Sequence, residues 1–135
     1  MWINTLVDKL RGMPQTTGAR GEWVAAKFLK RAGFRILAKN LSSRFGEIDI
    51  LAQAPDERTI VVVEVKSSVE QRDELRPEVH VDLKKQRKLS AMAADVVRSY
   101  GFADRPVRFD VIGVDLPEDG KPVIRHHEGA FESTI

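Results

Sequence analysis

Charged residues lie within two stretches of the sequence that are otherwise typical of buried β-strands. Asp49 is in the segment EIDILAQ, and Glu64 and Lys66 are in the segment TIVVVEVK. Removing an ionised group from water is costly unless the group is paired, hydrogen-bonded or bound to a metal. Charges in such apolar surroundings therefore need a chemical explanation.

The two carboxylates fit a site for a hard divalent cation. Side chains alternate across a strand, so Glu64 and Lys66 share one face, and two neighbouring strands would bring Asp49 beside Glu64. Mg²⁺ and Mn²⁺ prefer oxygen ligands and leave some positions to water and substrate phosphate. We therefore predict Mg²⁺ or Mn²⁺ held by Asp49 and Glu64, with the carbonyl of Val65 as a candidate further ligand.

Two more charged groups complete the predicted catalytic site. The ammonium of Lys66 would orient the attacking water or stabilise the charge that develops on a phosphodiester. Glu22 lies at the border of the apolar face of a predicted helix and could add a ligand, directly or through water. The alternative is that Lys66 pairs with Glu64 or Asp49 at a strand end, and such a pair would carry no functional meaning.

Hydrophobic periodicity and turn residues predict the elements that position this site. A helix is expected at 18–32, with Thr16 or Thr17 as its cap and Gly33 as its stop, and strands follow in FRILAKN, EIDILAQ and TIVVVEVK. A second helix is expected from residue 81 or 82 to 100, and strands follow in PVRFDVIGVDL and KPVIRHH. A strand, a crossover helix and a further strand favour a parallel pair, so we predict an α/β sheet flanked by helices.

Several individual residues in these elements carry expectations. The inward stripe of the second helix is predicted to contain Leu89, Ala93, Val96, Tyr100 and the amide of Gln86, which must find partners or face a cleft. Phe45 is expected to be exposed, Asp110 is interpreted as structural, and the adjacent His126 and His127 as ordinary strand residues. The long polar segment 67–80 is expected to be functional or mobile.

Composition favours one globular domain of residues 1–135, with an N-terminal extension at 1–16 and a core at about 17–131. The chain has no cysteine, which excludes disulfides, zinc–thiolate sites and Cys nucleophiles and fits a cytoplasmic location. The longest apolar run, IVVVEV, is too short to span a membrane, so we expect no membrane association. Apolar residues at helical spacing in 2–10 predict a short N-terminal helix.

Basic residues cluster in two regions although the net charge is only +2. Residues 9–44 are rich in Lys and Arg and contain one acidic residue, Glu22, and a second basic cluster opens the second helix. Such clustering is typical of a phosphate-binding surface and also of a solvated helix face. The predicted nucleic-acid-binding residues are Arg20, Lys27, Arg44, Lys84, Lys85, Arg87 and Lys88.

The sequence also resembles a known group of nucleases. The segments GEIDILA and VVVEVKSS resemble the Asp and Glu-x-Lys motifs of the restriction-endonuclease-like PD-(D/E)XK nuclease superfamily. Together with GARGEWVAAKFL, KKQRKL and RFDVIGV, they are similar to the YraN-like family of small bacterial proteins, relatives of Holliday-junction resolvases. The resemblance implies an αβββαβ core, active-site positions at Glu22, Asp49, Glu64 and Lys66, and Gln86 as a cleft residue.

Together these features predict a metal-dependent endonuclease that hydrolyses phosphodiester bonds in DNA, with branched or otherwise structured DNA as the candidate substrate. Two-fold symmetric junctions would suit a homodimer, although no residues define a dimer surface. One alternative is a non-catalytic nucleic-acid-binding or adaptor protein on a nuclease fold. Another is an interaction domain whose N-terminal segment docks a partner.

Overall fold

The computed structural model describes residues 16–69 and 80–135. The predicted N-terminal helix and most of the long polar segment lie outside the described residues. The elements in the described parts are α2 (Thr17–Arg31), β1 (Arg35–Ser43), β2 (Gly46–Gln53), β3 (Ile60–Ser68), α3 (Leu83–Ser99), β4 (Val107–Asp115) and β5 (Val123–Phe131).

The strands form one mixed sheet in the order β1-β2-β3-β4-β5. All neighbouring pairs are antiparallel except β3 and β4, which are parallel and are joined through α3. This confirms the predicted crossover, because a parallel pair needs a long connection and a helix supplies it. The described chain therefore has an α/β fold with the restriction-endonuclease-like αβββαβ core and one further strand at the edge.

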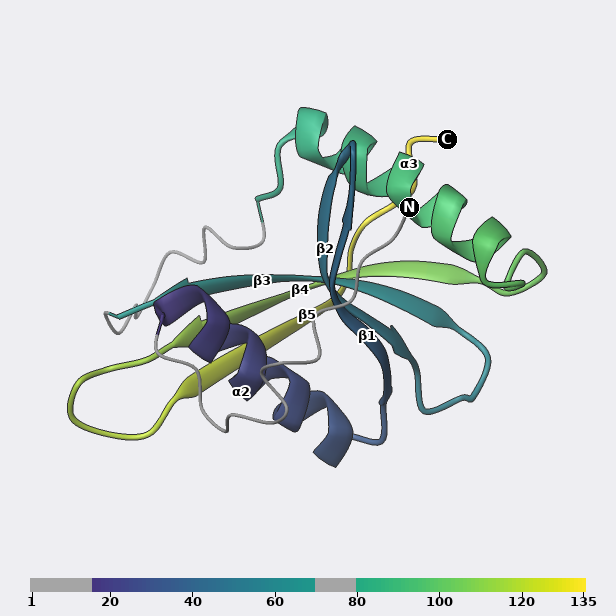
Figure 1. Ribbon diagram of the computed structural model, residues 1–135. Coiled ribbons are helices and arrows are strands. Elements are labelled where there is room, and N and C mark those ends of the chain that lie inside the picture. Colours follow the sequence, from purple (N-terminus) through teal and green to yellow (C-terminus); the bar gives the residue numbers. More distant parts are fainter. Residues whose placement is uncertain (1–15, 70–79) are drawn as a thin grey trace.

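The two helices lie on opposite faces of the sheet (Figure 1). Against α2 pack the side chains of one strand face, including Ile50, Val61 and Val63, and against α3 pack those of the other, including Leu51 and Val62. Because β2 and β3 are covered on both faces, they read as almost continuous apolar runs. Two charged residues within these runs, Asp49 of β2 and Glu64 of β3, are therefore largely shielded from water.

The helix ends agree with the sequence prediction to within about a residue. Thr16 caps α2 by accepting a hydrogen bond from the backbone N–H of Ala19 at 3.2 Å. The chain then leaves α2 through Gly33, whose φ of +93° few other residues adopt. The prediction that Tyr100 points inward is wrong: it is 41% exposed, because α3 ends at Ser99 and Tyr100 is its cap.

The β1–β2 hairpin bends sharply in its outer half. Ile48 and Leu51 are three residues apart yet both face α3, although regular alternation would place them on opposite faces. At the bend, Asn40 of β1 has a φ of +53°. Pairing between β2 and β3 correspondingly ends at Ile50 opposite Val63, so the sheet opens at the next residue of β2, Asp49.

Candidate active site

Asp49 lies where β2 separates from β3. Its Oδ2 accepts a hydrogen bond of 2.8 Å from the backbone N–H of Val65, so the carboxylate takes the place of a strand partner. Val65 lies between Glu64 and Lys66, the two charged residues of β3. This bond therefore fixes the Asp49 carboxylate beside the Glu-x-Lys segment.

Glu64 is a buried carboxylate on the α3 face of the sheet, with 7% of its surface exposed. Its Oε1 accepts a hydrogen bond of 2.8 Å from Nζ of Lys85, which projects from the first turn of α3. Burial alone would lower the pKa of Lys85, but the hydrogen bond and charge of Glu64, together with the charge of Asp49, raise it. The ammonium is thus held in its charged form against the carboxylate.

Glu22 reaches the same place from α2, on the other side of the sheet. Its neighbour Gly21 is buried against Ser67 of β3: a Cβ at this position would lie 2.8 Å from Cβ of Ser67 and would overlap its hydroxyl oxygen. Only glycine therefore allows α2 to approach β3 this closely. The consequence is that a carboxylate oxygen of Glu22 lies within 4.8 Å of one of Asp49.

Three carboxylates converge at this opening of the sheet. One oxygen of Glu22, one of Glu47 and one of Asp49 all lie within 4.8 Å of one another. The sequence did not single out Glu47 as a ligand, although strand alternation places it on the same face as Asp49. An all-oxygen donor set of this kind could bind a hard divalent cation such as Mg²⁺ or Mn²⁺.

The electrostatics of the cluster favour added positive charge. Burial raises the pKa of Asp49 to about 8, the charges of Glu64 and Glu22 contribute to the increase, and the Val65 amide and Lys85 oppose it. Burial likewise raises the pKa of Glu22, and the charge of Glu47 adds to that increase. Among the described residues, the four carboxylates of Glu22, Glu47, Asp49 and Glu64 outnumber the ammonium groups of Lys39 and Lys85 that act on them, and a dication would offset this excess of negative charge.

Lys66 and Gln86 are both engaged by backbone carbonyls. Nζ of Lys66 donates to the carbonyl of His80 at 3.2 Å, so its ammonium holds the segment that enters α3. Nε2 of Gln86 donates to the carbonyl of Val81 at 2.8 Å and holds the same segment. The ion pair at Glu64 that the sequence offered to Lys66 is made by Lys85 instead.

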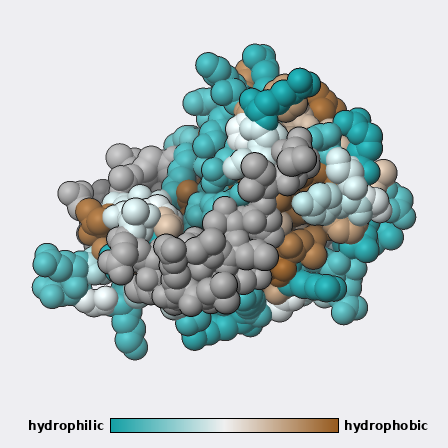
Figure 2. Space-filling model, viewed as in Figure 1, coloured by the Kyte–Doolittle hydropathy of each residue, from teal (hydrophilic) through white to brown (hydrophobic). Residues whose placement is uncertain are grey.

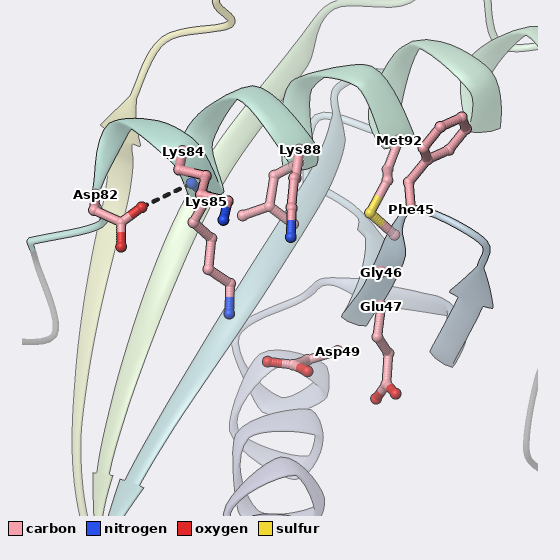
Figure 3. A pocket seen from close by; sticks show the side chains of 10 residues that line it. Phe45, Gly46, Glu47, Asp49, Asp82, Lys84, Lys85, Lys88 and Met92 are labelled. Carbon is pink, nitrogen blue, oxygen red and sulfur yellow. Dashed lines mark hydrogen bonds between the residues drawn. The ribbon is translucent and has the colours of Figure 1, made fainter.

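A hollow of about 370 Å³ lies between the hairpin tip and α3 (Figure 3). The carboxylates of Glu47 and Asp49 belong to the hairpin wall. The ammonium groups of Lys84, Lys85 and Lys88 project from α3 on the opposite wall, and that of Lys85 reaches toward Asp49. One wall thus presents two carboxylates, and the other presents three ammonium groups together with the carboxylate of Asp82 at the start of α3. Over α3, the upper edge of the molecule is largely hydrophilic, with some hydrophobic side chains among the hydrophilic ones (Figure 2).

The predicted basic residues do not all meet at this hollow. Arg44 lies at the hairpin tip with its guanidinium 4.8 Å from the ring of Phe45, which is 49% exposed as predicted. Lys27 instead contacts the ring of Trp23 at 4.1 Å on α2, and Arg20 lines a separate hollow near Leu116. Of the basic residues predicted to bind nucleic acid, Lys84, Lys85 and Lys88 of α3 are therefore the ones that line the hollow together with Glu47 and Asp49.

Comparisons with known proteins identify the family. Residues 21–114 match the model of the uncharacterised protein family UPF0102. The chain belongs to this family. UPF0102 proteins from Pelobacter propionicus and Porphyromonas gingivalis are 41% and 45% identical to it over 87% and 84% of this chain, and over 84% and 82% of their own lengths.

Membership of UPF0102 confirms the predicted YraN-like family, which is part of the PD-(D/E)XK-like nuclease superfamily. A third UPF0102 protein, from Symbiobacterium thermophilum, is 38% identical over 90% of this chain and 100% of its own length. Among solved structures, SfsA of Pyrococcus furiosus in complex with Ca²⁺ matches with a TM-score of 0.38 and 17% identity, over 82% of this chain and 61% of SfsA.

The length and hydropathy of the helices in the described residues show whether one of them could cross a membrane. Neither α2 nor α3 has the length and apolar character that a bilayer-spanning helix requires.

Proposed function

We propose that this chain is a metal-dependent endonuclease that hydrolyses phosphodiester bonds in DNA, with branched or otherwise structured DNA as the preferred class. The observation that carries the proposal is the hollow with Glu47 and Asp49 on one wall and three lysines on the other. A cation-binding wall opposite a phosphate-binding wall matches the two needs of phosphodiester hydrolysis. The nuclease-like fold and family support nucleic acid as the ligand.

The residues that would hold the metal are Asp49 and Glu64, together with the carbonyl oxygen of Val65. The carboxylates of Glu22 and Glu47, which lie beside Asp49, would supply further ligands. Their oxygen atoms suit Mg²⁺ or Mn²⁺. When bound, such an ion would activate water and stabilise negative charge on the phosphoryl oxygens. The hydrogen bond from Val65 keeps the Asp49 carboxylate oriented without the ion.

Basic residues supply the rest of the proposed chemistry. Lys84 and Lys88 would hold the DNA backbone through phosphate contacts that are independent of base sequence. Lys66 would assist the attacking water from its position on the same strand face as Glu64. For this role the ammonium of Lys66 must leave the carbonyl oxygen of His80, to which it now donates at 3.2 Å, and turn to the substrate.

The test is a cleavage panel with a four-way junction, a flap and a linear duplex, each with Mg²⁺, Mn²⁺ or EDTA. The wild type should cleave only with metal, and Asp49→Asn should lose at least about 100-fold in rate because an interaction made in the transition state is removed. Asp119→Asn, in the exposed turn after β4, is the matched control and should cleave as the wild type does. Cleavage in EDTA, or equal loss in both variants, would contradict the proposal.

A second candidate function is nucleic-acid binding without catalysis. It is favoured by one observation: Glu64 and Lys66 are each already engaged by protein groups, namely Lys85 and the His80 carbonyl. Under this alternative, gel-shift experiments would show junction binding while no metal produces cleavage. Sedimentation of the free and junction-bound protein would in addition test the predicted homodimer.

A further inference from the structure

The basic residue that contacts Glu64 comes from α3 rather than from the Glu-x-Lys motif. Nζ of Lys85 is 2.8 Å from Oε1 of Glu64, whereas Nζ of Lys66 is 3.2 Å from the carbonyl oxygen of His80. Lys84 and Lys88 line the same hollow from the same helix. Lys85 is thus singled out among neighbouring lysines by a direct bond to a predicted metal ligand.

The two members of this pair differ strongly in their surroundings. The side chain of Glu64 is 8% exposed, whereas that of Lys85 is 48% exposed. A buried carboxylate needs a nearby positive charge, so without a metal Glu64 depends on Lys85. Lys85 has no such dependence, because its flexible stem starts from the solvent-exposed side of α3 and its ammonium is readily hydrated.

A divalent cation at Glu64 would compete with the ammonium for the same carboxylate. Like charges at adjoining positions repel, so the ammonium must leave Oε1 or the cation binds weakly. The hollow into which Lys85 projects is also lined by Lys84 and Lys88 and would contain the phosphate under the proposed function. A displaced Lys85 therefore has a second anionic partner within reach of its own side chain.

We propose that Lys85 is an exchangeable counter-ion, which neutralises Glu64 in the metal-free protein and transfers to the substrate phosphodiester when a divalent cation takes its place. This inference rests on the proposed function, since it takes Glu64 as a metal ligand. Before metal binds, the charge of Lys85 is neutralised by Glu64, so only Lys84 and Lys88 are left on the α3 wall to attract phosphate. After metal binds, all three lysines can do so. Metal binding and substrate binding thereby reinforce each other through one side chain.

The test measures Mn²⁺ affinity by isothermal titration calorimetry in the absence of DNA. Lys85→Met keeps the stem and removes the competing charge, so it should bind Mn²⁺ about tenfold more tightly than the wild type or better. Lys88→Met, one turn away in the same hollow, should stay within about threefold because exposed charges at a distance are screened. Equal or weaker Mn²⁺ binding by Lys85→Met would overturn the proposal.

The melting temperature provides a second test, which does not depend on enzymatic activity. In EDTA, Lys85→Met should melt below Lys88→Met because Glu64 is left buried without its partner. Added Mn²⁺ should raise the melting temperature of Lys85→Met more than that of the wild type. An equal Mn²⁺-induced shift would mean that the Lys85–Glu64 pair is only a structural ion pair.

Cleavage then separates this inference from the proposed function. At saturating Mn²⁺, Lys85→Met should lose about tenfold or more in rate, since the phosphodiester loses a positive partner. If the wild type binds Mn²⁺ and cleaves but Lys85→Met binds Mn²⁺ no more tightly, the inference fails and the proposed function stands. If no variant binds Mn²⁺ and Asp49→Asn behaves as the wild type does, both fail.

Discussion

Asp49 on β2 and Asp110 on β4 are both withdrawn from water, but they have opposite electrostatic environments. Asp110 is 1% exposed and accepts hydrogen bonds from Nε and a second guanidinium nitrogen of Arg108, at 2.8 and 3.0 Å. It also contacts Nε2 of His126 at 2.7 Å and accepts from the backbone N–H of Gly129. Although burial alone would raise its pKa, His126 and Arg108 lower it.

At Asp49, burial raises the pKa and the charges of Glu64 and Glu22 raise it further, while the Val65 amide and Lys85 oppose the increase without reversing it. The comparison shows that an aspartate in a strand is not by itself a sign of function. At Asp110 Arg108 and His126 contact the carboxylate directly, as expected of a structural residue. At Asp49 the described residues bring more negative than positive charge, and this difference is what a bound cation could offset.

The largest expected effect that distinguishes the two sites is on stability. Asp110→Asn should lower the free energy of unfolding by about 3 kcal/mol or more, because it breaks a buried charged network. Asp49→Asn should raise it in EDTA, since the amide can still accept from Val65 and the repulsion by Glu64 and Glu22 is gone. Chemical denaturation of both variants measures the difference. Destabilisation of similar size in both would remove the contrast.

The next largest effect concerns the packing that brings Glu22 to Asp49. Gly21→Ala should cost about 1–3 kcal/mol, because its methyl group overlaps Ser67 and forces α2 away from β3. Gly18→Ala is the matched control on the same helix, where an added Cβ meets nothing within 4 Å. It should be neutral or slightly stabilising. Equal denaturation midpoints for the two variants would show that the close approach is unimportant.

A third prediction uses the raised pKa of Asp49, about 8 in the folded chain against an ordinary value of 3.8. Between these values the folded state holds a proton that the unfolded state has released, so stability in EDTA should fall as the pH rises. The slope from one such group is at most about 1.4 kcal/mol per pH unit. Asp49→Asn should flatten the slope, and Asp110→Asn should not. Stability that rises with pH across this window would contradict the assignment.

The smallest effect is on the salt dependence of DNA binding. Lys88→Gln should reduce the slope of log affinity against log salt by about 1, because one phosphate contact is lost. Lys121→Gln, in the exposed connection before β5, should leave the slope unchanged. Fluorescence anisotropy with a labelled junction measures both. An unchanged slope in Lys88→Gln would mean that the α3 wall does not contact the DNA backbone at Lys88.

Much of this arrangement could be predicted from local sequence signals. Strand alternation placed Glu64 and Lys66 on one face, and glycine and threonine signals located the ends of α2. The parallel β3–β4 pair followed from the helix between them. These features depend on neighbouring residues, so periodicity is sufficient to find them.

The partners of the charged groups could not be predicted in this way. Lys85 is 21 residues from Glu64, and His80 is 14 residues from Lys66. Strand alternation places Glu47 on the face of Asp49, but these two carboxylates meet Glu22 only because α2 packs beside the hairpin. Such contacts depend on how the helices and the hairpin pack together, which neither charge clustering nor periodicity specifies.

The bond from Val65 to Asp49 has a consequence for reading relatives of this protein. Since that carboxylate also closes a gap in the β-ladder, a relative without the proposed activity would still need an acceptor of similar shape there. Asparagine would satisfy the fold alone, whereas only aspartate would satisfy both the fold and the proposed metal site. An exchange between these two residues at position 49 is therefore the substitution by which an inactive lineage could be recognised.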